Sequence, residues 1–435
     1  MLNGIIQDRL YNHGGNVARL KINGYTPLIG KVSISGAKNE ALKVVPLSII
    51  INGKIEISNV PDILDVANQT KILKSTGADV SYGVKTITVD TSAVSKSDIT
   101  LTCAGKLRAS IVFAGPLLAR FSHVTLPYPG GCLIGARSIE THLDAFKQVG
   151  AKIVENKNVF SISIKQQKDS IVNLNEKSVT GTENIIMYAA GIEATTLITN
   201  CAIEPEITHL ASNLEKAGCK ISGIGTRELR IRGSKKLRLE KYEIMPDRIE
   251  AGTFMAAFVA TSGEGEIYPY PANDLETFTR AVESTGAMIR IENNRAIIKK
   301  QPRGLKPFAI ETAPYPGFPT DLQSPMSLLA ARAKGVSLIR ENMFENRLFY
   351  LKELEKMGLR VNLLDKQVAE ISGPATFKPT TIESLDLRSG ITLLVAAIMT
   401  EGETVIKNAE IIDRGYEDIE TKLKNLGAKI ERFAE

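Results

Sequence analysis

One cysteine of the chain stands in a setting that suits a reactive thiol. Cys132 lies in the segment YPGGCLIGAR, with Gly130, Gly131 and Gly135 around it and Arg137 five residues further on. A nearby arginine favours the thiolate, and glycines allow a loop to close over a ligand. We interpret Cys132 as a functional thiol in an adaptable loop; the alternative is a loop cysteine without a role.

Charged and polar residues also gather where the most apolar helices of the sequence are expected to begin. They are Lys38, Asn39, Arg108, Lys177, Arg248, Asp321 and Arg388. The free N–H groups and the dipole make a helix start positive, so a basic residue there is unfavourable unless an anion binds. The pattern predicts binding of a phosphate or carboxylate. The alternative for any one position is an exposed lysine or arginine at the end of a loop.

Two aspartates precede such helices, Asp321 in FPTDLQ and Asp386 in SLDLRSG. As N-caps they would each stabilise a helix by about 1 kcal/mol. A carboxylate among cations also remains ionised and can accept a proton from a substrate hydroxyl. Both roles stay open for both residues.

The chain repeats itself six times. A glycine followed by a small or apolar residue and a β-rich stretch recurs at Gly77, Gly150, Gly218, Gly286, Gly358 and Gly427. An amphipathic stretch precedes each glycine, which fits a helix that ends in a left-handed residue. The helices of a second set, such as RIEAGTFMAAFVA, are apolar almost all round and are predicted to be buried. Six such units divide naturally into two domains of three.

The remaining cysteines follow this repeat. Cys219 takes the place of an alanine in sister copies, and Cys201 follows Asn200 as Val60 follows Asn59. We expect both to be inert core residues. Cys103 ends an apolar run and gives no functional signal.

The composition of the chain limits the classes of protein to which it can belong. The 435 residues are 43% hydrophobic and 23% charged, with a net charge of +6 and basic and acidic residues interspersed. This favours a globular protein with anionic ligands and argues against nucleic-acid binding. Four cysteines without a CxxC pair and four scattered histidines predict neither a disulfide framework nor a metal site. No apolar stretch approaches membrane-spanning length, so we expect a cytoplasmic protein.

Several motifs together identify a resemblance. In chain order they are SGAKNEAL, LRAS, GGCLIGAR, IEPEI, MPDRIEAGTF, APYPGFPTDLQ, MFENR, LDLRSG and IIDRGYE. The chain resembles the UDP-N-acetylglucosamine 1-carboxyvinyltransferases, a family of enolpyruvyl transferases, from about residue 20 to residue 435. Motifs in one order are more specific than any of them alone.

The resemblance implies a fold and a division of the chain. The fold is an inside-out α/β prism: two domains, each of three βαβαββ repeats, with the active site between them. One domain would combine residues 1–37 with 246–435. The other would span residues 38–245 and carry the Cys132 loop.

The resemblance also implies the reaction. The enolpyruvyl group of phosphoenolpyruvate would pass to the 3′-hydroxyl of UDP-N-acetylglucosamine by addition and elimination through a tetrahedral intermediate, with release of phosphate. This is the first committed step of peptidoglycan synthesis and the target of fosfomycin. The two small molecules would be the partners, with no cofactor, metal, nucleic acid or membrane; the oligomeric state stays open.

The family's site residues carry over by motif. The implied catalytic residues are Cys132 as proton donor, Asp321 as base, Lys38, Asp386 and Arg414. The phosphoenolpyruvate site would comprise Lys38, Asn39, Arg137, Arg347, Arg388 and Arg414. The UDP-sugar site would comprise Arg108, Arg137, Ser138, Ile139, Glu140, Thr141, Lys177, Ser178, Val179, Thr180, Asp321 and Met343.

The chain departs from the family pattern at three places. Residues 1–19 form an extension, Ser138 replaces a common proline, and Glu140 replaces a common aspartate. These changes bear on the nucleotide contacts and leave room for an alternative, an enolpyruvyl transferase of the same fold that acts on another nucleotide or nucleotide sugar. A second alternative is a non-catalytic binding protein on this fold, against which the retained Lys38 and Arg414 argue.

Overall fold

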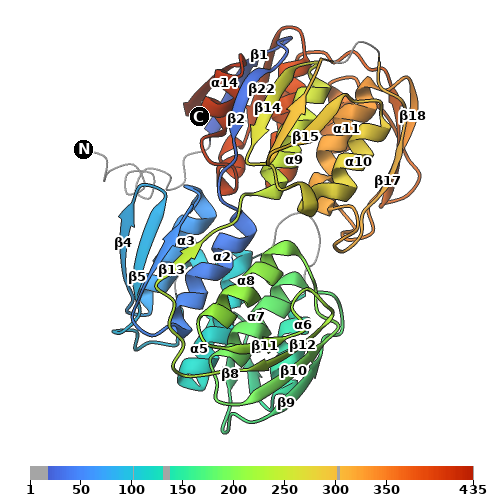
Figure 1. The fold of residues 1–435 in the computed structure, drawn as a ribbon. Helices are drawn as coiled ribbons and strands as arrows, with labels where there is room; N and C mark the ends of the chain where they lie inside the picture. Colours follow the sequence, from blue (N-terminus) through green and yellow to red (C-terminus); the bar gives the residue numbers. More distant parts are fainter. Residues whose placement is uncertain (1–17, 101, 131–137, 301–303, 435) are drawn as a thin grey trace. The chain divides into compact units, whose positions relative to one another are not determined.

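The computed structural model describes residues 18–434 except 101, 131–137 and 301–303. The chain divides into two compact units, each with its own hydrophobic core. Of the described residues, the first unit takes 36–245 and the second takes 18–35 with 246–434 (Figure 1).

Among the described residues, three almost wholly buried helices lie at the centre of each unit. In the first unit they are α2 (Lys38–Leu47), α5 (Ala114–Phe121) with its preceding 3₁₀ turn η2 (Arg108–Phe113), and α7 (Val179–Ala190). In the second they are α9 (Arg248–Ala260), α11 (Gln323–Arg332) and α13 (Leu387–Met399). All 13 residues of α9 are buried, and α9 packs on α11 and α13. The prediction that the most apolar helices are buried is confirmed.

Among the described residues, three sheets belong to each unit. The sheets of the first unit consist of β3 (Lys54–Ser58), β4 (Asp79–Gly83), β5 (Thr86–Asp90) and β13 (Lys241–Glu243); β6 (His123–Pro127), β7 (Lys152–Glu155) and β8 (Val159–Ser163); and β9 (Ser170–Asn173), β10 (Thr195–Thr199), β11 (Lys220–Ser222) and β12 (Glu228–Arg232). Those of the second consist of β2 (Ile29–Ser33), β14 (Glu264–Tyr268), β15 (Ile289–Glu292) and β16 (Arg295–Ile298); β17 (Ala309–Glu311), β18 (Gly335–Arg340), β19 (Arg360–Leu363) and β20 (Val368–Gly373); and β1 (Ala18–Asn23), β21 (Thr381–Glu383), β22 (Glu403–Lys407) and β23 (Lys429–Ala434).

One pairing pattern runs through these sheets. Each four-stranded sheet joins one parallel pair, such as β17 with β18, to antiparallel neighbours. In the three-stranded sheet a parallel bridge between Asp98 and Thr125 takes the place of the fourth strand. Strands such as β12 alternate exposed and buried residues, so that one face is covered. In each unit, helices at the centre are surrounded by such sheets. This is the predicted inside-out prism of βαβαββ repeats.

Amphipathic helices connect the strands. They are α3 (Leu64–Ser75), α6 (Glu140–Gln148), α8 (Pro205–Lys216), α10 (Glu276–Ser284), α12 (Leu351–Lys356) and α14 (Ile419–Asn425). The repeated glycine follows each of them with a positive φ between 88° and 106°. The predicted left-handed helix ends are therefore confirmed in all six copies.

The remaining helical elements are short. They are η1 (Ser48–Ile50), α4 (Thr102–Lys106), η3 (Ala272–Leu275), η4 (Thr320–Leu322) and η5 (Ala409–Arg414). Among the described residues, no helix is both long enough and apolar enough to cross a membrane.

Candidate active site

The first buried helix begins with a paired lysine. Lys38 is the first residue of α2, and its Nζ lies 2.9 Å from Oδ2 of Asp65 in the first turn of α3. Only 10% and 5% of the two side chains are exposed. The ammonium and the free N–H groups of α2 together make this helix start suitable for an anion. Asn39 is the next residue of the same turn.

A buried glutamate holds that turn in place. Glu40 accepts hydrogen bonds from the hydroxyl of Tyr242 at 2.6 Å and from the backbone N–H of Met245 at 2.7 Å. It also pairs with Nδ1 of His209. These contacts attach the start of α2 to distant parts of the first unit, which fixes the position of Lys38.

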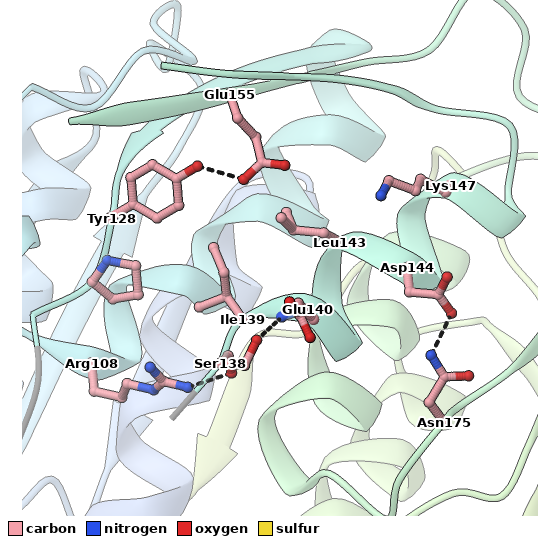
Figure 2. A pocket seen from close by; sticks show the side chains of 11 residues that line it. Arg108, Tyr128, Ser138, Ile139, Glu140, Leu143, Asp144, Lys147, Glu155 and Asn175 are labelled. Atoms are coloured by element: carbon pink, nitrogen blue, oxygen red, sulfur yellow. Dashed lines mark hydrogen bonds between the residues drawn. The ribbon is translucent and has the colours of Figure 1, made fainter. Parts of the chain in front are cut away.

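A pocket of about 580 Å³ opens beside the start of α6 (Figure 2). Its lining comprises Arg108, Tyr128, Pro129, Ser138, Ile139, Glu140, Leu143, Asp144, Lys147, Glu155 and Asn175. Nη2 of Arg108 donates to the carbonyl of Ser138 at 2.8 Å, and Oγ of Ser138 accepts from the N–H of Glu140 at 2.9 Å. Cations, carboxylates and apolar side chains in one pocket suit a polar organic ligand. Four residues predicted to contact the UDP-sugar therefore line the same pocket.

Tyr128 and Glu155 form a second polar group in this pocket. The Tyr128 hydroxyl donates to Oε2 of Glu155 at 2.5 Å, and its ring lies 5.3 Å from the ring of Phe160. Desolvation and the neighbouring carboxylate raise the pKa of Tyr128 to about 12, so it remains a donor at neutral pH.

Each of the two segments predicted to bind the UDP-sugar forms a hydrogen bond with a residue that flanks the other segment. Oγ1 of Thr141 donates to Oε1 of Glu176 at 2.8 Å, and Nε2 of His142 lies 3.1 Å from Oγ1 of Thr180. Burial, together with Arg108, lowers the pKa of His142 to about 3, so the ring is neutral. Residues 138–141 and 177–180 are therefore neighbours in the first unit.

The cap of α7 lies within the second of these segments. Ser178 is the N-cap residue, and its Oγ accepts from the N–H of Gly181 at 3.2 Å. Val179 and Thr180 form the first turn, and Lys177 is exposed just before the cap. This arrangement leaves the lysine beside a helix start, where an anion is favoured.

In the second unit one aspartate joins two arginines. Oδ1 of Asp321 accepts from Nη2 of Arg347 at 2.6 Å, and Oδ2 accepts from Nε and Nη2 of Arg388 at 3.1 and 3.0 Å. The arginine side chains are only 5% and 6% exposed, whereas Asp321 is 24% exposed. Burial lowers the pKa of Arg388, but Asp321, Tyr416 and Asp247 outweigh it and raise the pKa above its ordinary value. The structure thus brings together three residues predicted for the site.

The two predicted caps behave differently. Asp386 caps α13 and accepts from the N–H groups of Arg388 at 2.8 Å and Ser389 at 3.2 Å, as a capping box. Of the two roles left open for Asp321, the cap is not found: the N-cap residues of η4 and α11 are Pro319 and Leu322, and neither helix has a side-chain cap bond. Its carboxylate binds the two guanidinium groups instead of the N–H groups of its own helix.

Two further predicted residues lie near anchored acids. The N–H of Met343 donates to Oε1 of Glu341 at 2.8 Å. Arg414 ends η5, and the preceding Asp413 accepts two hydrogen bonds of 2.8 Å each from Arg432 of β23. Met343 and Arg414 thus each follow, within two residues, an acid whose side chain is held by hydrogen bonds.

The cysteines fall into two groups. Cys132 and also Arg137 lie outside the described residues. Cys201 and Cys219 are buried, and burial raises the pKa of both thiols to about 12, which confirms them as inert core residues. Cys103 is half-buried.

Sequence reasoning missed Asp65, Tyr128, Glu155 and Glu341. Asp65 lies six residues after Asn59, in a segment where the repeat register was visible, so its place at a helix start was a usable signal. The other three are defined by contacts with residues distant in sequence. Within the described ranges, no cluster of three or more histidine, cysteine, aspartate or glutamate side chains could hold a metal ion.

The chain is similar to solved structures of enolpyruvyl transferases. The enolpyruvyl transferase NikO from Streptomyces tendae superimposes with a TM-score of 0.87 at 24% identity, covering 97% of this chain and 100% of that chain. EPSP synthase from Acinetobacter baumannii gives a TM-score of 0.72 at 17% identity, covering 96% and 100%. At these identities the likeness concerns the fold, and it confirms the predicted prism.

Sequence relatives are much closer. UDP-N-acetylglucosamine 1-carboxyvinyltransferase 2 of Carboxydothermus hydrogenoformans is 38% identical over 415 residues, which is 95% of this chain and 99% of the relative. UDP-N-acetylglucosamine 1-carboxyvinyltransferase of Campylobacter hominis is 39% identical over 419 residues, or 96% and 99%. The model of the EPSP synthase (3-phosphoshikimate 1-carboxyvinyltransferase) family matches residues 22–423. The chain therefore belongs to the EPSP synthase family and, within it, to the UDP-N-acetylglucosamine 1-carboxyvinyltransferases.

Proposed function

We propose that this enzyme transfers the enolpyruvyl group of phosphoenolpyruvate to the 3′-hydroxyl of UDP-N-acetylglucosamine and releases phosphate. This is the first committed step of peptidoglycan synthesis. Relatives of that name align along almost the whole chain. The free cysteines among the described residues fit a reducing compartment, so we place the reaction in the cytoplasm.

Residues of the first unit would bind both substrates. Lys38 and Asn39 would contact the phosphate of phosphoenolpyruvate, since the start of α2 suits an anion. The UDP-sugar would lie against Arg108, residues 138–141 and residues 177–180. Arg108 and residues 138–140 line one pocket, and hydrogen bonds through the flanking Glu176 and His142 keep the other predicted residues close to it. Cys132 would donate the proton to C3 of phosphoenolpyruvate, and Arg137 would bind its phosphate.

Residues of the second unit would supply the remaining contacts to the two substrates. Arg347 and Arg388 would bind the carboxylate of phosphoenolpyruvate, and Arg414 its phosphate. Asp386 would serve by capping α13 and so fixing Arg388 at the helix start. Met343 would contact the UDP-sugar.

The observation that carries this proposal is the contact of Asp321 with two guanidinium groups. A substrate carboxylate is the same kind of ligand and would compete for Arg347 and Arg388. Binding of phosphoenolpyruvate would thereby free the carboxylate of Asp321 to accept the proton of the sugar hydroxyl. The hydroxyl oxygen then attacks C2 while C3 gains a proton, and loss of phosphate and a C3 proton restores the enol ether.

Release of inorganic phosphate tests the proposal. It should require phosphoenolpyruvate and UDP-N-acetylglucosamine together, with neither sufficient alone. A parallel reaction with UMP in place of the nucleotide sugar should release none. Phosphate release with UMP and not with UDP-N-acetylglucosamine would favour the alternative acceptor.

A further inference from the structure

A single buried carboxylate connects two loops of the proposed site. Glu341 directly follows β18 and is fully buried. Its Oε1 accepts from the N–H groups of Met343 at 2.8 Å and Phe344 at 3.2 Å, and from Oγ1 of Thr312 at 3.0 Å. Its Oε2 accepts from Oγ1 of Thr320 at 2.7 Å. One side chain therefore accepts four hydrogen bonds.

The donors come from two separate segments of the chain. Thr312 directly follows β17, and Thr320 begins η4, the turn that contains Asp321. Met343 and Phe344 belong to the loop that leads to Arg347. The bond of 2.6 Å between Arg347 and Asp321 spans the same two loops at the site. Glu341 thus bonds to both of the segments that the Asp321–Arg347 contact joins.

Because Glu341 is buried, its carboxylate needs hydrogen-bond donors from the protein. A desolvated carboxylate is strongly destabilising unless donors surround it. Within the described part of the chain its partners are two hydroxyls and two backbone N–H groups, and no cation pairs with it. Loop arrangements that remove these donors are therefore disfavoured, so the carboxylate selects one arrangement of both loops.

We infer that Glu341 is a positioning residue for the reaction: it sets the orientation of Asp321 and Arg347 without touching substrate. The inference rests on the proposed roles of Asp321 and Arg347. Misplacement of a reacting group by about 1 Å can lower a rate by roughly 100-fold. A residue that fixes two such groups should therefore affect turnover strongly.

Two substitutions at this position should behave differently. Glu341→Ala removes all four acceptor contacts and should lower kcat by about 30-fold or more while raising the KM for phosphoenolpyruvate. Glu341→Gln keeps the carbonyl acceptor at Oε1, and the Thr320 hydroxyl can reverse to accept from the amide. This variant should remain within about 5-fold of the original kcat.

A buried glutamate elsewhere in the second unit provides a matched control. Glu353 is buried in α12 and accepts from the N–H of Glu383 at 3.1 Å and from Nζ of Lys356 at 2.6 Å. Glu353→Ala should lower the unfolding temperature but leave kcat of the folded enzyme within about 2-fold. Equal losses of kcat in the two alanine variants would overturn the inference.

A double-mutant cycle separates this inference from the proposed function. If Glu341 acts on kcat through Asp321, Glu341→Ala should change the residual kcat of Asp321→Asn by less than about 3-fold, whereas independent effects would multiply. The rise in the KM for phosphoenolpyruvate, which reports on Arg347, should persist in the double variant. Multiplying effects overturn the positioning role. An unchanged kcat in Asp321→Asn alone would instead contradict the proposed base.

A milder change covers the case in which Glu341→Ala does not fold. Thr320→Val removes only the donor to Oε2, and Thr320→Ser restores it. The valine variant should lower kcat by about 10-fold, and the serine variant should stay within about 2-fold of the original enzyme. Equal kcat values for the two threonine variants would also overturn the inference.

Discussion

Three of the cations predicted to bind substrate are held by the protein's own carboxylates. Asp65 pairs with Lys38, and Asp321 binds Arg347 and Arg388. Buried charges of this kind are tolerated only when they are paired and hydrogen-bonded. The phosphate or carboxylate of a substrate would replace one anion by another without exposing an unpaired cation, which keeps the change in solvation small.

Asp321→Asn tests the proposed base. The amide keeps the shape of the side chain but cannot take up the hydroxyl proton, so kcat should fall by about 100-fold or more. Binding of UDP-N-acetylglucosamine, followed by calorimetry, should remain measurable. Asp365→Asn, at a turn acid of the same unit, should leave kcat unchanged. An undiminished kcat in Asp321→Asn would remove the base.

Fosfomycin tests the reactive cysteine. We expect inactivation with a single covalent adduct on the peptide that contains Cys132, located by mass spectrometry. Cys201 and Cys219 should stay unmodified, because burial raises the pKa of both thiols to about 12. Cys132→Ser should form no adduct. An adduct on Cys103, or activity lost with no adduct, would contradict the assignment.

Part of the site could be predicted from the residues alone. Lys38, Arg108 and Arg248 do begin buried helices, because helix starts follow from local pattern. The partners of Asp321 could not be predicted in this way: Arg347 and Arg388 lie 26 and 67 residues away. Glu341 likewise carries no local signal, since its role depends on donors from two loops.

The elements themselves follow closely from sequence. The recurring glycine marked six helix ends, and each has the positive φ that such an end needs. The order of the strands within each sheet could not be predicted in the same way. Strand β13 pairs with β3, and β1 lies between β22 and β23, so strands far apart in sequence share a sheet. Local periodicity carries no information on such distant partners.

Gly286→Ala tests the helix ends. Gly286 has a φ of +88°, and an added Cβ would meet nothing within 4 Å, so the only penalty is backbone strain. The free energy of unfolding should fall by about 1–2 kcal/mol in urea titrations. Gly286→Asn should be less harmful, because asparagine tolerates the left-handed region. Equal losses for the two variants would contradict this explanation.

At the scale of the whole molecule, a buried acid in the first unit should make stability depend on pH. Glu183 in α7 is fully buried, and Nζ of Lys43 lies 3.2 Å from its Oε2 without hydrogen-bond alignment. Burial raises the pKa of Glu183 from 4.5 to about 8, with Lys43 opposing the rise. The folded chain therefore holds a proton that the unfolded chain releases between these values.

The sign of the effect follows from this difference. Stabilisation by the protonated Glu183 is complete below pH 4.5 and is lost as the pH rises towards 8. Relative to Glu183→Gln, the free energy of unfolding of the original protein should fall by on the order of 2 kcal/mol between pH 5 and pH 8. The exposed Glu228→Gln should show a curve parallel to that of the original protein. Parallel curves for Glu183→Gln would contradict the prediction.

The most direct test of the account identifies the product by NMR. Phosphoenolpyruvate and UDP-N-acetylglucosamine are incubated with the enzyme, and phosphate and the nucleotide sugar are followed together. We expect equal amounts of inorganic phosphate and of a sugar that carries an enol ether at its 3′-oxygen. Phosphate without the enol ether, or an ether at another oxygen, would contradict it.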